Sequence, residues 1–234
     1  MKRHLIRQLG LGAVLFVASA CLFGLIAEDV VAGGRLTLLD EQLAQWLHRS
    51  ASAEMTRWML LVSQLHATGA MAMYTGTLGL LAFKKQQWRR VAMLTLCMGG
   101  GLLLNVLMKL AFQRARPEFA DPIITLSTYS FPSGHVAAST IFYGLGVVWV
   151  FGRTRAIHWR VLVLAAAAVA VLLVAFSRLY LGVHYLSDAG AAFAEGVGWL
   201  TLCLCALAVW WPKAHSIPHA RVVVHAPEQT NPNP

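Results

Sequence analysis

The stretch VLVLAAAAVAVLLVAF, residues Val161–Phe176, contains no polar side chain and decides the class of fold. A helix rises about 1.5 Å per residue and the hydrocarbon core of a bilayer is about 30 Å thick, so this run and its apolar neighbours are long enough to cross a membrane. The whole chain agrees, because 58% of its 234 residues are hydrophobic, 12% are charged and the mean hydropathy is +0.61. Soluble domains average about 45–50% apolar and about 25% charged residues. We therefore expect an integral membrane protein.

Other apolar segments of about 20 residues lie on both sides of this stretch and predict further spans. The expected fold is all-α, a six-helix membrane bundle over residues 1–211, with spans at Leu9–Ala27, Trp58–Phe83, Val91–Phe112, His135–Gly152, Val161–Leu181 and Ala189–Trp211. Residues 36–47 place leucines on one helical face, which predicts a short helix that lies in the membrane interface or packs on the bundle. Residues 212–234 are rich in proline and polar residues, and we expect a disordered cytoplasmic tail.

The basic residues predict the orientation. Short loops rich in Lys and Arg stay on the cytoplasmic side, and such loops occur here on alternate crossings, at the N-terminus, at 84–90 and at 153–160. Both termini are then cytoplasmic, and the loops 28–57, 113–134 and 182–188 are extracytoplasmic. The same bias accounts for the net charge of +9 without a nucleic-acid partner. We expect a multi-pass protein of the cell membrane, in a bacterium the inner membrane.

The N-terminal segment also resembles a secretory signal, because Ala18-Ser19-Ala20 precedes Cys21 after a basic start and an apolar run. The apolar run continues to Ala27, which is longer than a typical signal core. We therefore expect an uncleaved membrane anchor, and the topology of the later spans does not depend on this choice.

Seven polar side chains stand at the outer ends of the third to sixth predicted spans. They are Lys109, Arg116, Ser133, His135, Arg178, His184 and Asp188. An ionisable group in a span costs on the order of a few kcal/mol unless it is paired or wetted, so each is a functional candidate. Cations beside a helix N-terminus, here at Ser133 and Gly134, favour a phosphate group, because backbone amides and the helix dipole stabilise an anion.

The two histidines have surroundings that suggest different tasks. His184 and Asp188 are four residues apart, so on a helix they share one face and the carboxylate can hold one ring nitrogen while the other stays free to attack. His135 has no carboxylate three or four residues further on, which suits a proton donor to a leaving oxygen.

Three motifs resemble those of the type 2 phosphatidic acid phosphatase family, membrane relatives of the vanadium haloperoxidases. They are KLAFQRARP at Lys109–Pro117, PSGH at Pro132–His135 and SRLYLGVHYLSD at Ser177–Asp188, and they match the family's patterns K-x6-RP, PSGH and SR-x5-H-x3-D. Three spaced motifs are far more specific than one short pattern.

The resemblance implies a role for each matched residue. Lys109, Arg116 and Arg178 bind phosphoryl oxygens, and Ser133 with the Gly134 amide completes the cradle. His184 attacks phosphorus to give a phosphohistidine, Asp188 orients it, and His135 protonates the leaving oxygen. No metal and no other cofactor is implied, because side-chain cations and amides meet the charge that Mg²⁺ neutralises in other phosphoryl transfers.

Several polar or small residues lie outside the motifs, and simpler roles are expected for them. Glu195 is expected to be structural, and Arg114 to interact with lipid headgroups rather than to recognise a second phosphate. Gln64, His66 and Thr68 are expected to hydrogen-bond a neighbouring helix rather than a substrate headgroup, and Gly99–Gly101 to permit close helix approach.

The function that these observations predict is a metal-independent phosphoric monoester or diphosphate hydrolase acting on a lipid phosphate at the outer leaflet. Among substrates a polyprenyl diphosphate such as undecaprenyl diphosphate comes first, followed closely by phosphatidylglycerol phosphate and phosphatidic acid. The expected partners are this lipid and the bilayer. A phosphotransferase using the same intermediate stays open, whereas a transporter would place its charges near the midplane.

Overall fold

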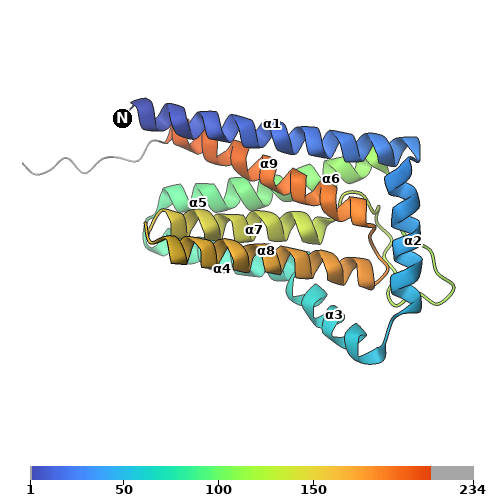
Figure 1. Ribbon diagram of the computed structural model, residues 1–234. Helices are drawn as coiled ribbons and strands as arrows, with labels where there is room; N and C mark the ends of the chain where they lie inside the picture. The colour runs from blue at the N-terminus through green and yellow to red at the C-terminus, as the bar shows by residue number, and fades with distance from the viewer. Residues whose placement is uncertain (1, 212–234) are drawn as a thin grey trace, which may run out of the picture.

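The computed structural model describes residues 2–211, and its regular elements are all helical, with no strand in that range (Figure 1). The expected tail at 212–234 lies outside the described residues. The helices are α1 (Lys2–Ala32), α2 (Arg35–Arg49), α3 (Ala53–Leu65), α4 (Thr68–Lys84), α5 (Trp88–Leu94), the π-helical turn η1 (Thr95–Gly99), α6 (Gly100–Phe112), α7 (Gly134–Phe151), α8 (Ile157–Tyr180) and α9 (Leu186–Trp210).

Five helical segments in the described part of the chain are long and apolar enough to cross a membrane. They are Leu5–Ala32, Trp88–Phe112, Gly134–Phe151, Ile157–Tyr180 and Leu186–Trp210. These segments coincide with the first and with the third to sixth predicted spans. The protein is therefore an all-helical, multi-pass membrane protein, as its composition predicted.

The second predicted span is divided. A single helix over Trp58–Phe83 is wrong, because α3 ends at Leu65 and α4 begins at Thr68. His66 lies at the break, where its Nδ1 is 2.8 Å from the Val62 carbonyl oxygen and its Nε2 is 2.7 Å from the Tyr143 hydroxyl on α7. The expectation that His66 hydrogen-bonds a neighbouring helix is thereby confirmed. Its side chain bonds the backbone of the preceding turn, which favours a helix end over a continuous helix.

The long helices lie side by side, and α2 runs across one end of them (Figure 1). The helix α2 contacts α1, α8 and α9, and it buries Asp40, Ala44 and Leu47 against them. Leu39 and Trp46 point away and are exposed. The helix thus packs on the bundle while keeping an apolar outer surface, so the sequence-based picture of one leucine face directed to a single environment was incomplete.

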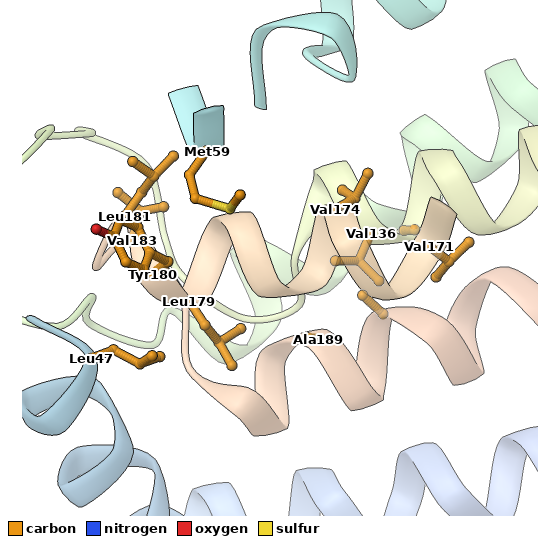
Figure 2. Packing of buried hydrophobic residues seen from close by; sticks show 12 residues of the cluster. Leu47, Met59, Val136, Val171, Val174, Leu179, Tyr180, Leu181, Val183 and Ala189 are labelled. Atoms are coloured by element: carbon orange, nitrogen blue, oxygen red, sulfur yellow. The ribbon is translucent and has the colours of Figure 1, made fainter. Parts of the chain in front are cut away.

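A buried hydrophobic cluster holds the segments that carry both predicted catalytic histidines (Figure 2). Val136, which follows His135, and Val183, which precedes His184, both belong to it and are almost completely buried. Leu47 and Met59 join the cluster from α2 and α3. Removal of such side chains from water contributes about 1.5–3 kcal/mol each, so this packing fixes the backbone beside the two histidines.

The π-helical turn and the glycines that follow it seat α6 against α9. The carbonyl oxygens of Leu96 and Cys97 accept hydrogen bonds from the indole Nε1 of Trp199, at 3.2 and 3.1 Å. A Cβ added at Gly100 would overlap the Trp199 ring, with Cε2 only 3.1 Å away, whereas Gly99 faces open space. The close approach expected at this glycine run is therefore confirmed at Gly100.

Replacement of Gly100 by Ala should lower the midpoint of thermal unfolding in detergent. Overpacking against a rigid, hydrogen-bonded indole costs about 1–3 kcal/mol, and the gain in helix propensity, at most about 1 kcal/mol, offsets only part of this cost. Gly99→Ala is the matched control and should leave the midpoint unchanged or raise it. Equal stabilisation by both substitutions would contradict the packing described.

Candidate active site

The seven residues of the predicted site lie at the end of the bundle that α2 covers. Lys109 is in the last turn of α6, Arg116 in the segment that follows it, Ser133 and His135 at the start of α7, Arg178 in the last turn of α8, His184 in the turn before α9 and Asp188 in the first turn of α9. Figure 1 shows these helix ends at the same side of the molecule. The fold therefore brings together motifs that are far apart in the sequence.

His184 and Asp188 form a buried pair. The His184 Nδ1 lies 3.3 Å from Asp188 Oδ2, and both side chains are almost inaccessible to solvent. The helix begins only at Leu186, so His184 precedes it, and the expectation of one shared helical face is corrected. Asp188 instead reaches back toward the turn, where its Oδ2 accepts a hydrogen bond from the Tyr185 backbone N–H at 2.9 Å. With Nδ1 facing the carboxylate, the lone pair of the His184 ring lies on Nε2, on the opposite side.

Two of the predicted phosphate-binding cations are anchored on the segment between α6 and α7. Arg116 donates from Nε to the Thr128 carbonyl at 2.7 Å, and its Nη1 lies 3.3 Å from His184 Nε2. Lys109 Nζ donates to the carbonyls of Tyr129 at 2.7 Å and Ser130 at 3.1 Å. Arg116 thus presents one nitrogen to the free side of the His184 ring.

Arg178 and Ser133 supply buried polar atoms without a hydrogen-bond partner. The Arg178 Nη1 donates to Ser63 Oγ, but its Nε has no partner, and neither has the hydroxyl of the completely buried Ser133. The backbone N–H of Ser133 donates to the Asp188 carbonyl at 3.2 Å, which places this serine beside the His184–Asp188 pair. Buried polar groups are normally paired, so these two atoms mark positions where a ligand's oxygen atoms would be stabilised.

His135 lies at the same end of the bundle with a partly exposed ring. The backbone N–H of Ser133, two residues earlier, donates to the Asp188 carbonyl, which brings the start of α7 close to the turn that carries His184. The hydrogen bonds of the described residues do not engage its ring nitrogens, which leaves them free for a substrate. The structure therefore places this histidine at the same end of the bundle as His184, with His135 in the first turn of α7 and His184 in the turn before α9.

Two functional candidates were missed or misjudged from the sequence. Arg114, which we expected at lipid headgroups, instead donates from Nη1 to Asp188 Oδ1 at 2.7 Å and from Nη2 to Asp40 Oδ2 at 2.9 Å. That expectation is wrong, because the two carboxylates draw the guanidinium inward. Asp40, on α2, is 2% exposed and also accepts the Ser187 backbone N–H at 2.9 Å. No local signal in the sequence ties Asp40 to partners so distant along the chain.

Glu195 lies deeper in the bundle, two turns of α9 beyond Asp188. Its Oε2 accepts a hydrogen bond from Asn105 Nδ2 at 2.9 Å, and its other oxygen has no partner. The polar partner fits the structural role expected for this acid. Across residues 2–211, no three His, Cys, Asp or Glu side chains are grouped so that they would hold a metal ion.

Comparison with known proteins gives this geometry a family. The sequence model of the PAP2 superfamily matches residues 90–212, and the chain belongs to that superfamily. The resemblance seen in the three motifs is thereby confirmed. Phosphatidylglycerophosphatase B of Bacillus subtilis (strain 168) is 34% identical over 117 residues, which are 49% of this chain and 56% of that relative. The match therefore spans little more than half of the relative's length.

Solved structures extend the similarity to most of the chain. The transmembrane PAP2-type phosphatidylglycerolphosphate phosphatase from Bacillus subtilis superposes with a TM-score of 0.71 at 25% identity, covering 87% of this chain and 98% of that one. LpxE of Aquifex aeolicus gives a TM-score of 0.55 at 19% identity, over 71% of this chain and 94% of the other, which is a likeness in fold alone.

The His184 imidazole should remain neutral well below neutral pH. Burial lowers the pKa of His184 to about 4, and the positive charges of Arg116 and Arg178 lower it too, while hydrogen bonding and charge from Asp188 oppose them. Because the folded-state pKa is depressed, the ring is uncharged above about pH 4 and protonates only below it. Nitrogen-15 NMR of the ring in substrate-free protein, assigned with His184→Gln, measures this directly. An apparent pKa near 6.5 would contradict the buried environment described.

Proposed function

We propose that this protein is a membrane lipid phosphate phosphatase that works through a phosphohistidine on His184. The observation that carries the proposal is the placement of this ring between Asp188 at Nδ1 and the Arg116 guanidinium, 3.3 Å from Nε2. A nucleophile held by a carboxylate on one side needs its substrate on the other, and a cation there attracts a phosphoryl group.

In the first step, a phosphoryl group occupies the cradle formed by Arg116, Arg178 and Lys109. The hydroxyl of Ser133 and the backbone amide of Gly134, at the start of α7, add neutral donors. The Nε2 lone pair of His184 attacks phosphorus, a P–N bond forms, and the P–O bond to the lipid breaks in line with it. Asp188 stabilises the positive charge that develops on the imidazole.

His135 serves as the acid and base of the cycle. In the first step it donates a proton to the departing lipid oxygen, so that an alcohol or a shorter phosphate leaves. In the second step it takes a proton from a water molecule that attacks the phosphohistidine, and the P–N bond breaks to release inorganic phosphate. His184 is then free for the next turnover, and the cycle requires no metal ion.

We further propose six crossings, with α4 as the additional one, both termini in the cytoplasm and the site on the extracytoplasmic side of the cell membrane. The start of α1, the end of α9 and the two basic loops at 84–90 and 153–160 lie at the end of the bundle opposite α2 (Figure 1). Seventeen residues of α4 span about 26 Å at about 1.5 Å per residue, close to the thickness of a thin bilayer.

The substrate is proposed to be a lipid that exposes a terminal phosphate. The activity for which two similar proteins are named favours phosphatidylglycerol phosphate. Undecaprenyl diphosphate, which the sequence alone placed first, and phosphatidic acid present the same terminal group and stay in the test. A lipid phosphotransferase would use the same phosphohistidine and differ only in the acceptor.

Phosphate release from a panel of these three lipids, measured on detergent-purified protein with EDTA present, tests the proposal. The unaltered protein should release phosphate from at least one of them. His184→Ala should abolish release, because the nucleophile is lost. Asp188→Asn should reduce the rate of release strongly. Arg178→Ala removes charge stabilisation worth several kcal/mol, so the rate should fall about a hundredfold or more.

Arg155→Ala provides the matched control, since this exposed arginine lies in a loop at the opposite end of the bundle. Its activity should equal that of the unaltered protein. Normal turnover by His184→Ala would reject the nucleophile, and strict dependence on added Mg²⁺ would reject the metal-free cradle. Loss of lipid substrate without free phosphate, with a phosphorylated second lipid appearing, would identify a phosphotransferase.

A further inference from the structure

Asp40, Arg114 and Asp188 form a continuous chain of buried charges. One guanidinium joins the two carboxylates, through Nη1 to Asp188 Oδ1 at 2.7 Å and through Nη2 to Asp40 Oδ2 at 2.9 Å. The side chains of the two acids are 2% or less exposed and that of the arginine is 11% exposed. Buried ions are stable only when they are paired and hydrogen-bonded, so each member depends on the next.

Ser187 closes this chain into a compact network. Its hydroxyl accepts from Arg114 Nη1 at 2.7 Å and donates to Asp40, while its backbone N–H donates to Asp40 Oδ1 at 2.9 Å. Asp40 is therefore held in place from the first turn of α9, next to Asp188 itself. The planar fork of an arginine suits such a bridge, because two of its nitrogens point in fixed directions.

We propose that Asp40 and Arg114 are positioning residues for Asp188, an inference that rests on the proposed function of His184. Arg114 occupies Asp188 Oδ1 and leaves Oδ2 to face His184 Nδ1. Asp40 holds the opposite edge of the guanidinium, so that Arg114 cannot turn toward a bound phosphate. The helix α2 thereby becomes part of the active site, although it carries no residue that touches the reacting atoms.

This arrangement also gives different surroundings to two arginines, Arg114 and Arg116, that are two residues apart in the sequence. Arg116 directs Nη1 at His184 Nε2, where a phosphoryl group is proposed to bind. Arg114 has its charge balanced by two carboxylates and is stacked on the Tyr185 ring, 4.2 Å from the centroid. Its positive charge is thus paired with carboxylates, whereas Arg116 donates to neutral partners, among them the carbonyls of Thr128 and Tyr129, and no carboxylate of the described residues pairs with it.

Asp40→Asn tests the proposal with kcat and KM measured separately. The amide keeps the shape of the side chain but loses the charge that holds Arg114, so kcat should fall about tenfold or more while KM changes by less than about twofold. Glu41→Gln is the matched control, because Glu41 is the next residue of α2 and is exposed. It should leave both constants unchanged. An unchanged kcat in Asp40→Asn would overturn the proposal.

A double-mutant cycle distinguishes positioning from a general structural role. Arg114→Gln removes the cation that lies between two buried carboxylates, and Asp40→Asn then removes one of these negative charges. The double variant should be no slower than Arg114→Gln alone, because both changes act through the same contact to Asp188. If the double variant instead loses kcat by the product of the two single-variant factors, the two residues act independently, and the proposal is overturned.

Arg114→Lys tests the same bridge if a charge-removing variant does not fold. Lysine retains the charge but cannot hold both carboxylates as a fork, so kcat should again fall about tenfold with KM nearly constant. Full activity in a folded Arg114→Lys protein would overturn the bridge. The proposed function is judged separately, by phosphate release from the unaltered protein and its loss in His184→Ala, so failure of one claim is distinguishable from failure of the other.

Discussion

One buried carboxylate determines how this end of the molecule is built. Asp188 is completely inaccessible to solvent, and an isolated ionised carboxylate would be costly there. Its two oxygens are therefore surrounded by donors: Arg114, the Ser130 hydroxyl, the Tyr185 backbone N–H and the His184 ring. These donors come from the segment between α6 and α7 and from the turn before α9. Satisfaction of a single negative charge thus holds separate parts of the chain in one arrangement.

The membrane explains why these charges lie at a helix end. In the hydrocarbon interior, cations such as Lys109, Arg116 and Arg178 would lack both water and an anionic partner, whereas at the end of the bundle water and the phosphate proposed to bind there can reach them. The helix α2 and the segment 113–133 close this end, and the apolar cluster beneath it keeps His135 and His184 in fixed positions. The candidate site thus combines a buried pair, His184 and Asp188, with side chains that are partly exposed, such as Lys109 and Arg116.

The sequence was sufficient wherever the signal was local or had a fixed spacing. Apolar length predicted six spans, five of which coincide with helices long and apolar enough to cross a membrane, and the three motifs predicted the family and the residues gathered at one end. The break at His66 escaped prediction, because the apolar pattern runs through it and the second partner of the His66 ring, Tyr143, is 77 residues away. Asp40 escaped for the same reason, because its partners Arg114 and Ser187 are 74 and 147 residues distant. Arg114 was misjudged because its charge alone does not reveal which carboxylates surround it.

Direct trapping of the covalent intermediate tests the central claim most closely. The protein is mixed with a lipid phosphate carrying a radioactive terminal phosphate, stopped in alkali within the first turnover and digested. Label is expected on the peptide that contains His184, stable in alkali and lost in acid as for a phosphoramidate, and absent from His184→Ala. Label on a serine or an aspartate, or turnover with no label on the protein at any time, would contradict it.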